Sequence, residues 1–247
     1  MTTFRVERRI VPPLTASRHA KLPDDLGKPA EDADTLKHAL IARYNRVYGD
    51  PRRVLALHSV VIQSPLLKDL LDVVLAGYPG VTVSLRRLEF SGTFEPLIHR
   101  WTEFKAEIQK LRDNPDEEID DDHATERLQH AELLYKLLET EFEETISSSQ
   151  DMMSQGVITY DLLWTVFQPG CLVHTKLHGH DRVFRMTSQN YGTDSCRNSV
   201  YWLTCQFVDG GASFFGTDKL NLKIYPYEGQ YCPSIHEVAP SVSQLQS

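Results

Sequence analysis

Apolar positions recur with two different periods along the chain, and the change falls near residue 156. Before it, apolar residues are mostly three or four positions apart, as on one face of a helix; after it, they alternate with polar residues, as in strands. We therefore expect an α+β protein with a helical N-terminal half, containing a short strand pair, and a C-terminal small antiparallel β-sheet or barrel. The predicted parts are a flexible N-terminal arm at 1–33, a mainly helical part at 34–155, a β-rich part packed on it at 156–240, and a polar tail at 241–247.

Four segments of the N-terminal half have the apolar spacing of amphipathic helices. The first is predicted to begin at Asp34, and the second at Ser64-Pro65, where a hydroxyl cap precedes a proline at the first helical position. The acidic stretch Asp116–Asp122 is expected to be a solvated link between the last two. The apolar positions of the four helices are Leu36, Leu40, Tyr44 and Val47; Leu67, Leu70, Leu71, Val74 and Leu75; Leu97, Trp101, Phe104, Ile108 and Leu111; and Leu128, Ala131, Tyr135, Leu138 and Phe142, the last helix running towards Ser147–Ser149.

Strand signals differ between the two halves. The apolar run near 54–61 predicts a strand covered on both faces, and alternation near 81–88 predicts a second strand. Between the halves, 160–167 is expected to be a short helix that Thr159 caps and that buries large side chains. In the β-rich part, strands separated by glycine turns are expected at 171–177, 182–187, 200–208, 213–216 and 220–225.

Charge is concentrated in one segment. Of the net charge of −8, Asp113–Glu144 contributes −11, from 13 acidic residues against Arg127 and Lys136, so the rest of the chain sums to about +3. No apolar run is long enough to cross a membrane, and the N-terminus lacks the apolar region of a signal peptide. We therefore expect an intracellular protein, cytoplasmic or nuclear, in which the four cysteines are reduced thiols.

Two kinds of cofactor site can be tested against the sequence. Gly211–Gly216 has the glycine spacing of a phosphate-binding loop, but Thr217-Asp218 stands where a lysine and a hydroxyl residue are needed, so we expect a hairpin turn. Cys171, His174, His178 and His180 could hold zinc, although Cys171 and His174 would point to opposite faces of a strand. We therefore predict no cofactor and no metal site, and leave open whether these four residues ever hold a metal.

Catalysis and nucleic-acid binding find little support in the sequence. No Gly-x-Ser-x-Gly motif occurs, and no cysteine lies in a nucleophile signature, although distant residues can still assemble a catalytic triad. The acidic stretch Asp116–Asp122 lacks the glycine of a calcium-binding loop. Nucleic-acid binding is disfavoured by a pI near 5.7. The sequence therefore predicts no catalytic residues.

Three blocks of sequence point to a known family. LHSVVIQSPLLKDLLDVVLAGYPGV, GVITYDLLWTVFQPG and VDGGASFFGTDKLNLKIYPYEGQ, in this order over residues 50–240, resemble the uncharacterised domain that precedes the ATPase module in fungal AAA-type ATPases. The most specific parts are Leu162–Gly170 and the pairs Asp209-Gly210 and Phe215-Gly216. In that family this region is non-catalytic, and the module after it hydrolyses nucleotide. Here no Walker motif follows before Ser247, so we expect a stand-alone relative or a fragment.

The resulting functional hypothesis is a non-catalytic protein-interaction domain without nucleotide hydrolysis of its own. It implies a protein partner and no membrane. The alternative is a metal-assisted enzyme that uses the region His174–His180.

Overall fold

The protein is described by a computed structural model that covers residues 5–9, 38–47, 54–85, 87–113, 121–177, 179–210, 215–229 and 239–240. The chain divides into two compact units. Unit 1 comprises Met1–Ala76 and Val81–Glu143, and unit 2 comprises Gly77–Gly80 and Glu144–Ser247. Each unit combines helices with a β-sheet, which confirms the predicted α+β class.

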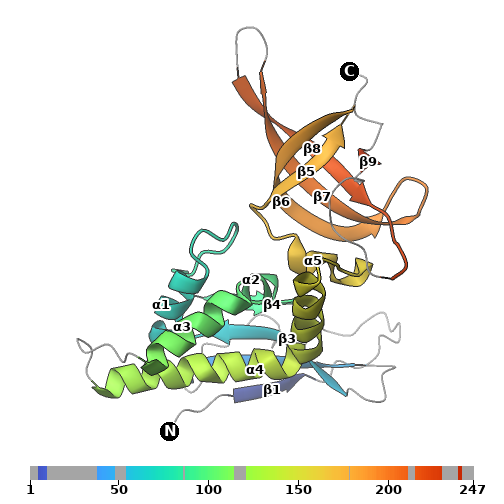
Figure 1. The fold of residues 1–247 in the computed structure, drawn as a ribbon. Coiled ribbons are helices and arrows are strands. Elements are labelled where there is room, and N and C mark those ends of the chain that lie inside the picture. Colours follow the sequence, from blue (N-terminus) through green and yellow to red (C-terminus); the bar gives the residue numbers. More distant parts are fainter. Residues whose placement is uncertain are drawn as a thin grey trace, which may run out of the picture. The chain divides into compact units, whose positions relative to one another are not determined.

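Unit 1 contains a four-stranded sheet with the strand order β1-β2-β3-β4 (Figure 1). β1 runs parallel to β2, whereas the β2–β3 and β3–β4 pairs are antiparallel. The four strands are β1 (Arg5–Arg9), β2 (Leu40–Arg46), β3 (Leu55–Ile62) and β4 (Leu88–Ser91). β1 lies within the predicted N-terminal arm, of which residues 1–4 and 10–33 are outside the described residues.

Parts of the two central strands of unit 1, residues 40–42 and 59–62, are buried on both faces. Successive residues point to opposite faces of a sheet, yet Ile41 and Ala42 are both buried, and so are Val60 and Val61. This burial explains the continuous apolar run of β3 and confirms the strand predicted near 54–61.

Two predictions in unit 1 are wrong. The helix expected to begin at Asp34 is instead the strand β2, because pairing with β1 and β3 outweighs a helical spacing that a half-apolar strand can imitate. The strand expected near 81–88 begins only at Leu88, and the described residues before it form turns. In both segments, the tertiary structure determined the secondary structure, and the local apolar spacing did not.

Unit 1 also contains helices (Figure 1). The N-terminus of α1 is formed as predicted: Ser64 is the N-cap, its hydroxyl oxygen accepts the Leu67 N–H at 3.2 Å, and proline occupies the first helical position. The third predicted helix is divided by a break at Arg100. The helices are α1 (Pro65–Val74), α2 (Glu95–His99), α3 (Trp101–Asp113) and α4 (Asp121–Ser154).

Helices α3 and α4 meet through aromatic side chains. The Trp101 and Tyr135 rings stack with their centroids 4.6 Å apart, and Phe104 packs edge-on against Tyr135 at 5.9 Å. α4 is longer than predicted, since it begins within the acidic stretch expected to be a link and continues beyond the serines at 147–149. The rest of that acidic stretch, at 116–120, lies outside the described residues.

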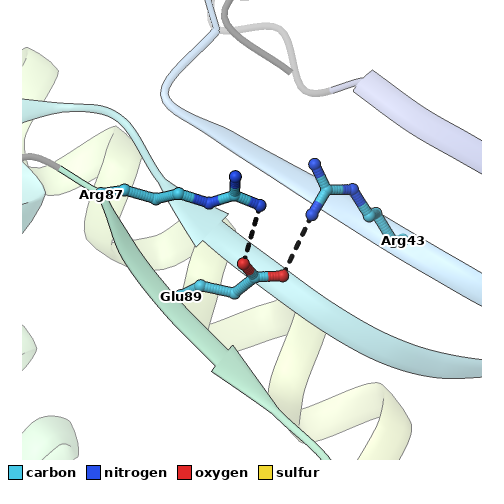
Figure 2. A network of polar contacts seen from close by, with 3 residues as sticks. All are labelled: Arg43, Arg87 and Glu89. Carbon is cyan, nitrogen blue, oxygen red and sulfur yellow. Dashed lines mark hydrogen bonds and ion pairs between the residues drawn. The ribbon is translucent and has the colours of Figure 1, made fainter. Parts of the chain in front are cut away.

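A charged network joins β2 to β4 across β3. Figure 2 shows the Glu89 carboxylate between two guanidinium groups, with Oε1 3.0 Å from Arg43 Nη1 and Oε2 2.8 Å from Arg87 Nη2. Arg43 comes from β2, and Glu89 from β4. The carboxylate thus links strands that do not hydrogen-bond to one another.

Unit 2 contains a five-stranded antiparallel sheet with the order β5-β6-β7-β8-β9 (Figure 1). The strands expected at 213–216 and 220–225 form one strand from Phe215, and the strand expected at 182–187 extends from His180 to Thr193. No pairing among the described residues closes this sheet into a barrel. The strands are β5 (Leu172–Leu177), β6 (His180–Thr193), β7 (Ser199–Gly210), β8 (Phe215–Ile224) and β9 (Ala239–Pro240).

The short helix expected at 160–167 consists of a 3₁₀ turn, η3 (Tyr160–Leu162), followed by α5 (Leu163–Val166). Thr159 is its N-cap by position, but its side chain makes no capping hydrogen bond. Leu163, Trp164 and Phe167 are buried as predicted, and the Phe167 ring lies 5.9 Å from that of Tyr201 on β7. The segment thereby covers part of one face of the sheet in unit 2.

Candidate interaction surface

The sheet of unit 2 has two unlike faces. Along β5, Val173, Thr175 and Leu177 are buried, whereas the residues between them, such as Leu172 and Lys176, are exposed. Cross-strand partners share a face, so the register carries this division across β6, β7 and β8. We call the side of the sheet that bears Leu172, His174 and Lys176 the outer face.

One row of the outer face crosses four strands. Leu172 pairs with Arg185, Arg185 with Gln206, and Gln206 with Lys219. Directly opposed residues of antiparallel strands have their Cβ atoms about 5 Å apart. These four side chains therefore form a continuous line perpendicular to the strands.

Three aliphatic side chains of the outer face are exposed to solvent. The exposed fractions are 65% for Leu172, 56% for Val183 and 73% for Val208. Val183 and Val208 are each two residues from the Arg185–Gln206 pair and lie side by side, which agrees with the 5.5 Å contact between the intervening Phe184 and Phe207 rings. Large apolar residues usually occupy the inward positions of a strand, and here they occupy outward ones.

The outer face also carries more positive than negative charge. Lys176, Arg185, Lys219 and Lys223 lie on it by register, against the carboxylate of Asp181 and that of Asp194, which interacts electrostatically with Lys223. His174 Nε2 lies 3.4 Å from that carboxylate. The face is therefore basic, in contrast to the acidic helix α4.

Trp202 is an aromatic residue of this face. It is half-buried, and the Lys223 ammonium lies 4.8 Å from the centroid of its ring. A cation placed over an aromatic face is attracted by the ring quadrupole. Lys223 thus occupies one side of the ring that would otherwise be available for stacking.

The candidate metal ligands do not converge where the structure describes them. His174 is on the outer face, whereas His180 pairs with the inward-facing Leu177 and so lies on the opposite side. Cys171 is half-buried just before β5, and His178 lies outside the described residues. Throughout the described ranges, no three histidine, cysteine or carboxylate residues form a group that could hold a metal ion.

The glycine-rich candidate loop connects two paired strands. Gly210 of β7 pairs with Phe215 of β8 in an antiparallel ladder, and residues 211–214, where the hairpin turn is predicted, lie outside the described part. Thr217 and Asp218 then belong to β8. A phosphate-binding loop needs a helix N-terminus at this place, and the chain supplies a strand.

A tyrosine cluster attaches η3 to the sheet. Tyr191 Oη donates a hydrogen bond to the Tyr160 carbonyl at 2.8 Å, and Tyr227 Oη donates one to the Ile158 carbonyl at 3.2 Å. Burial raises the pKa of Tyr191 well above its usual value, so the phenol stays neutral. Because each phenol binds a backbone carbonyl, we interpret the cluster as structural.

The buried thiol of Cys205 and the half-buried thiol of Cys171 are poorly suited to nucleophilic chemistry. Burial raises the pKa of Cys205 to about 12 and also raises the pKa of Cys171. A thiol attacks as the thiolate, which these shifts disfavour. Cys171, Cys196 and Cys205 are free, and Cys232 lies outside the described residues.

Unit 1 brings together a serine, a histidine and a carboxylate that sequence analysis did not connect. Ser64 Oγ lies 2.8 Å from His130 Nδ1, and His130 Nε2 lies 3.7 Å from Glu126 Oε1. However, Ser64 is 6% and His130 9% exposed, and the serine oxygen already accepts the Leu67 N–H. We therefore interpret this group as a structural link between the start of α1 and α4.

Unit 1 also has a cavity of about 350 Å³ between β2 and α4. Its polar groups are largely engaged: Glu141 accepts the Leu57 N–H at 3.4 Å, and the Thr140 hydroxyl donates to the Lys136 carbonyl at 2.8 Å. Few groups remain to orient a ligand, so we assign it no binding role. Its lining residues are Leu40, Tyr44, Leu133, Lys136, Leu137, Thr140 and Glu141.

Fold and surface together define an α+β protein with one exposed, basic and aliphatic sheet face. A domain of unknown function, DUF7025, is found at residues 148–233, which include β5, β6, β7 and β8. Comparison with curated proteins gave no match, and neither did comparison with solved structures. None of the helices in the described part of the chain has a stretch both long and apolar enough to cross a membrane.

Proposed function

We propose that this chain is a non-catalytic protein-interaction domain and that its protein partner binds the outer face of the unit 2 sheet. The observation that carries the proposal is the exposure of Leu172, Val183 and Val208 on one face. Contiguous exposed apolar side chains rimmed by polar ones are typical of protein-binding surfaces. Covering these side chains would remove apolar area from water and favour association.

The absence of catalysis is supported by the state of the candidate nucleophiles. The pKa of Cys205 and of Cys171 is raised, and the Ser64 hydroxyl is buried and engaged as a helix cap. Purified protein is therefore expected to show no turnover of ATP.

The resemblance to the domain ahead of the ATPase module in fungal AAA-type ATPases is part of this proposal. Two of the three blocks that carry the resemblance lie mainly within residues 148–233, the stretch matched by the domain of unknown function. We propose that the chain acts inside the cell as such domains are thought to act, by holding a substrate or an adaptor protein.

The test compares two triple variants of the complete chain. L172S/V183T/V208T makes the outer face polar, whereas V54T/V73T/L85S changes three similarly exposed aliphatic residues of unit 1. A partner cross-linked to the wild-type protein and identified by mass spectrometry should bind the first variant about tenfold more weakly or worse. It should bind the control variant as it binds the wild type.

Circular dichroism must show that both variants are folded. Equal retention of the partner by the two variants, or equal loss, would contradict the assignment of this face.

A further inference from the structure

The charge of the outer face indicates what kind of partner it can bind. We infer that the partner supplies an acidic polypeptide segment that also bears aliphatic side chains. This inference rests on the proposed function, because it concerns the same surface. It adds the chemical class of the partner.

The row Leu172–Arg185–Gln206–Lys219 carries unbalanced positive charge. The Asp181 carboxylate lies against His174 at 3.4 Å and opposite Lys176 in the register, and the Asp194 carboxylate interacts with Lys223. Among the described residues, no carboxylate forms an ion pair with Arg185 or Lys219. A partner that places carboxylates over these two cations gains electrostatic complementarity and faster association.

Cations and aliphatic side chains occupy neighbouring positions on the outer face. Leu172 is directly opposite Arg185, and Val183 and Val208 follow on the next outward positions of β6 and β7. A partner therefore has to satisfy both kinds of contact within neighbouring positions. A polypeptide can do so because it can place acidic and apolar side chains next to one another.

The outer face fits an acidic polypeptide better than a nucleic acid, which is also acidic. Surfaces that bind single strands combine positive charge with aromatic side chains on which bases stack. Around the row, the exposed apolar side chains that the structure describes are the aliphatic Leu172, Val183 and Val208, and the Trp202 ring has Lys223 over one side. These described positions thus supply the charge for a nucleic acid but no open aromatic ring on which a base could stack.

The experiment measures binding of labelled probes to the complete chain by fluorescence anisotropy. The probes are a short synthetic peptide of alternating glutamate and leucine, the corresponding lysine–leucine and glutamate–serine peptides, and an oligothymidine. We expect the glutamate–leucine peptide to bind most tightly, and we expect its affinity to fall as the salt concentration rises. The glutamate–serine peptide should bind more weakly because it cannot cover the aliphatic side chains.

Charge reversal locates the site. R185E/K219E should lower the affinity for the glutamate–leucine peptide at least tenfold. K105E/K136E, which reverses two exposed cations on helices of unit 1, should leave that affinity unchanged. Equal effects of the two variants would overturn the inference. So would tighter binding of oligothymidine or of the lysine–leucine peptide.

Two further outcomes are distinguishable. If L172S/V183T/V208T loses a cellular partner that R185E/K219E retains, the proposed function stands and the acidic partner is wrong; if both variants retain it, both proposals fail. Self-association of the wild type that R185E/K219E abolishes would contradict the separate protein partner of the proposed function, since the acidic segment would then come from a second copy of this chain.

Discussion

The sheets of the two units differ in which side chains they bury. In unit 1, neighbouring residues of the central strands are both buried, as Val60 and Val61 are in β3. In unit 2, burial alternates along β5 and along residues 201–206 of β7, so that Leu203 is buried and Thr204 is half-exposed. A stretch of sheet covered on both faces contributes mainly to the stability of the fold, whereas a stretch with one open face can also present side chains to a partner.

The contrast also accounts for the unusual residues of the outer face. Aliphatic side chains at outward strand positions contribute little to the stability of the folded chain, because they stay in water. Leu172, Val183 and Val208 therefore have no stabilising role that the structure shows, and they are the residues on which the proposed binding function depends.

The largest expected effect comes from truncating neighbouring residues in each sheet. Val60→Ala and Val61→Ala should each lower the free energy of unfolding by about 2 kcal/mol, because both side chains are buried. Leu203→Ala should lower it by roughly 3 kcal/mol, while Thr204→Ala should change it by less than about 0.5 kcal/mol. Urea unfolding of the four variants measures the difference.

The comparison fails if either valine substitution leaves the free energy of unfolding unchanged. An unchanged free energy of unfolding in Val61→Ala, for example, would mean that this face of the unit 1 sheet is open, like the outer face of unit 2.

A smaller effect is expected where α1 begins. Ser64→Ala removes the acceptor for the Leu67 N–H and the hydroxyl that contacts His130, and should destabilise the protein by about 1 to 2 kcal/mol. Ser147→Ala, an exposed serine of α4, is the control and should be close to neutral. Thermal unfolding of both variants is sufficient to test this link.

His130 makes the stability of unit 1 depend on pH. Burial lowers the pKa of His130 from its usual 6.5, and Glu126 offsets part of this shift. The unfolded chain therefore binds the proton more readily, so the stabilising contribution is fully present above pH 6.5 and is lost as the pH falls towards the folded-state pKa. Unfolding measured between neutral and mildly acidic pH should show this loss.

The control separates His130 from other titrating groups. His130→Gln should flatten the dependence over this pH range, whereas His123→Gln, at an exposed position of α4, should preserve it. An unchanged pH profile in His130→Gln would assign the effect elsewhere.

The smallest effect is expected for the network in Figure 2. Glu89→Gln removes the carboxylate that Arg43 and Arg87 share, but all three side chains are partly exposed. Such pairs contribute at most about 1 kcal/mol, and salt screens them. The loss in unfolding free energy should therefore shrink in high salt, and a loss that salt does not change would indicate packing instead.

The sequence alone determined the elements whose signals are local. Ser64 and Pro65 predicted the start of α1, and the apolar spacing from Leu97 to Ile108 predicted the buried side of α2 and α3. These signals lie within a few residues of one another, so no distant contact is needed to interpret them.

Only the tertiary structure decided what depends on distant partners. The segment Leu40–Arg46 has helical spacing, yet it is a strand because β1 and β3 hydrogen-bond to it. Likewise, Leu172, Arg185, Gln206 and Lys219 come from four separate strands, and only the register, which includes an irregularity between Met186 and Ser188, places them in one row. A one-residue change in that register would move side chains to the opposite face, which is why the outer face could not be derived from the sequence.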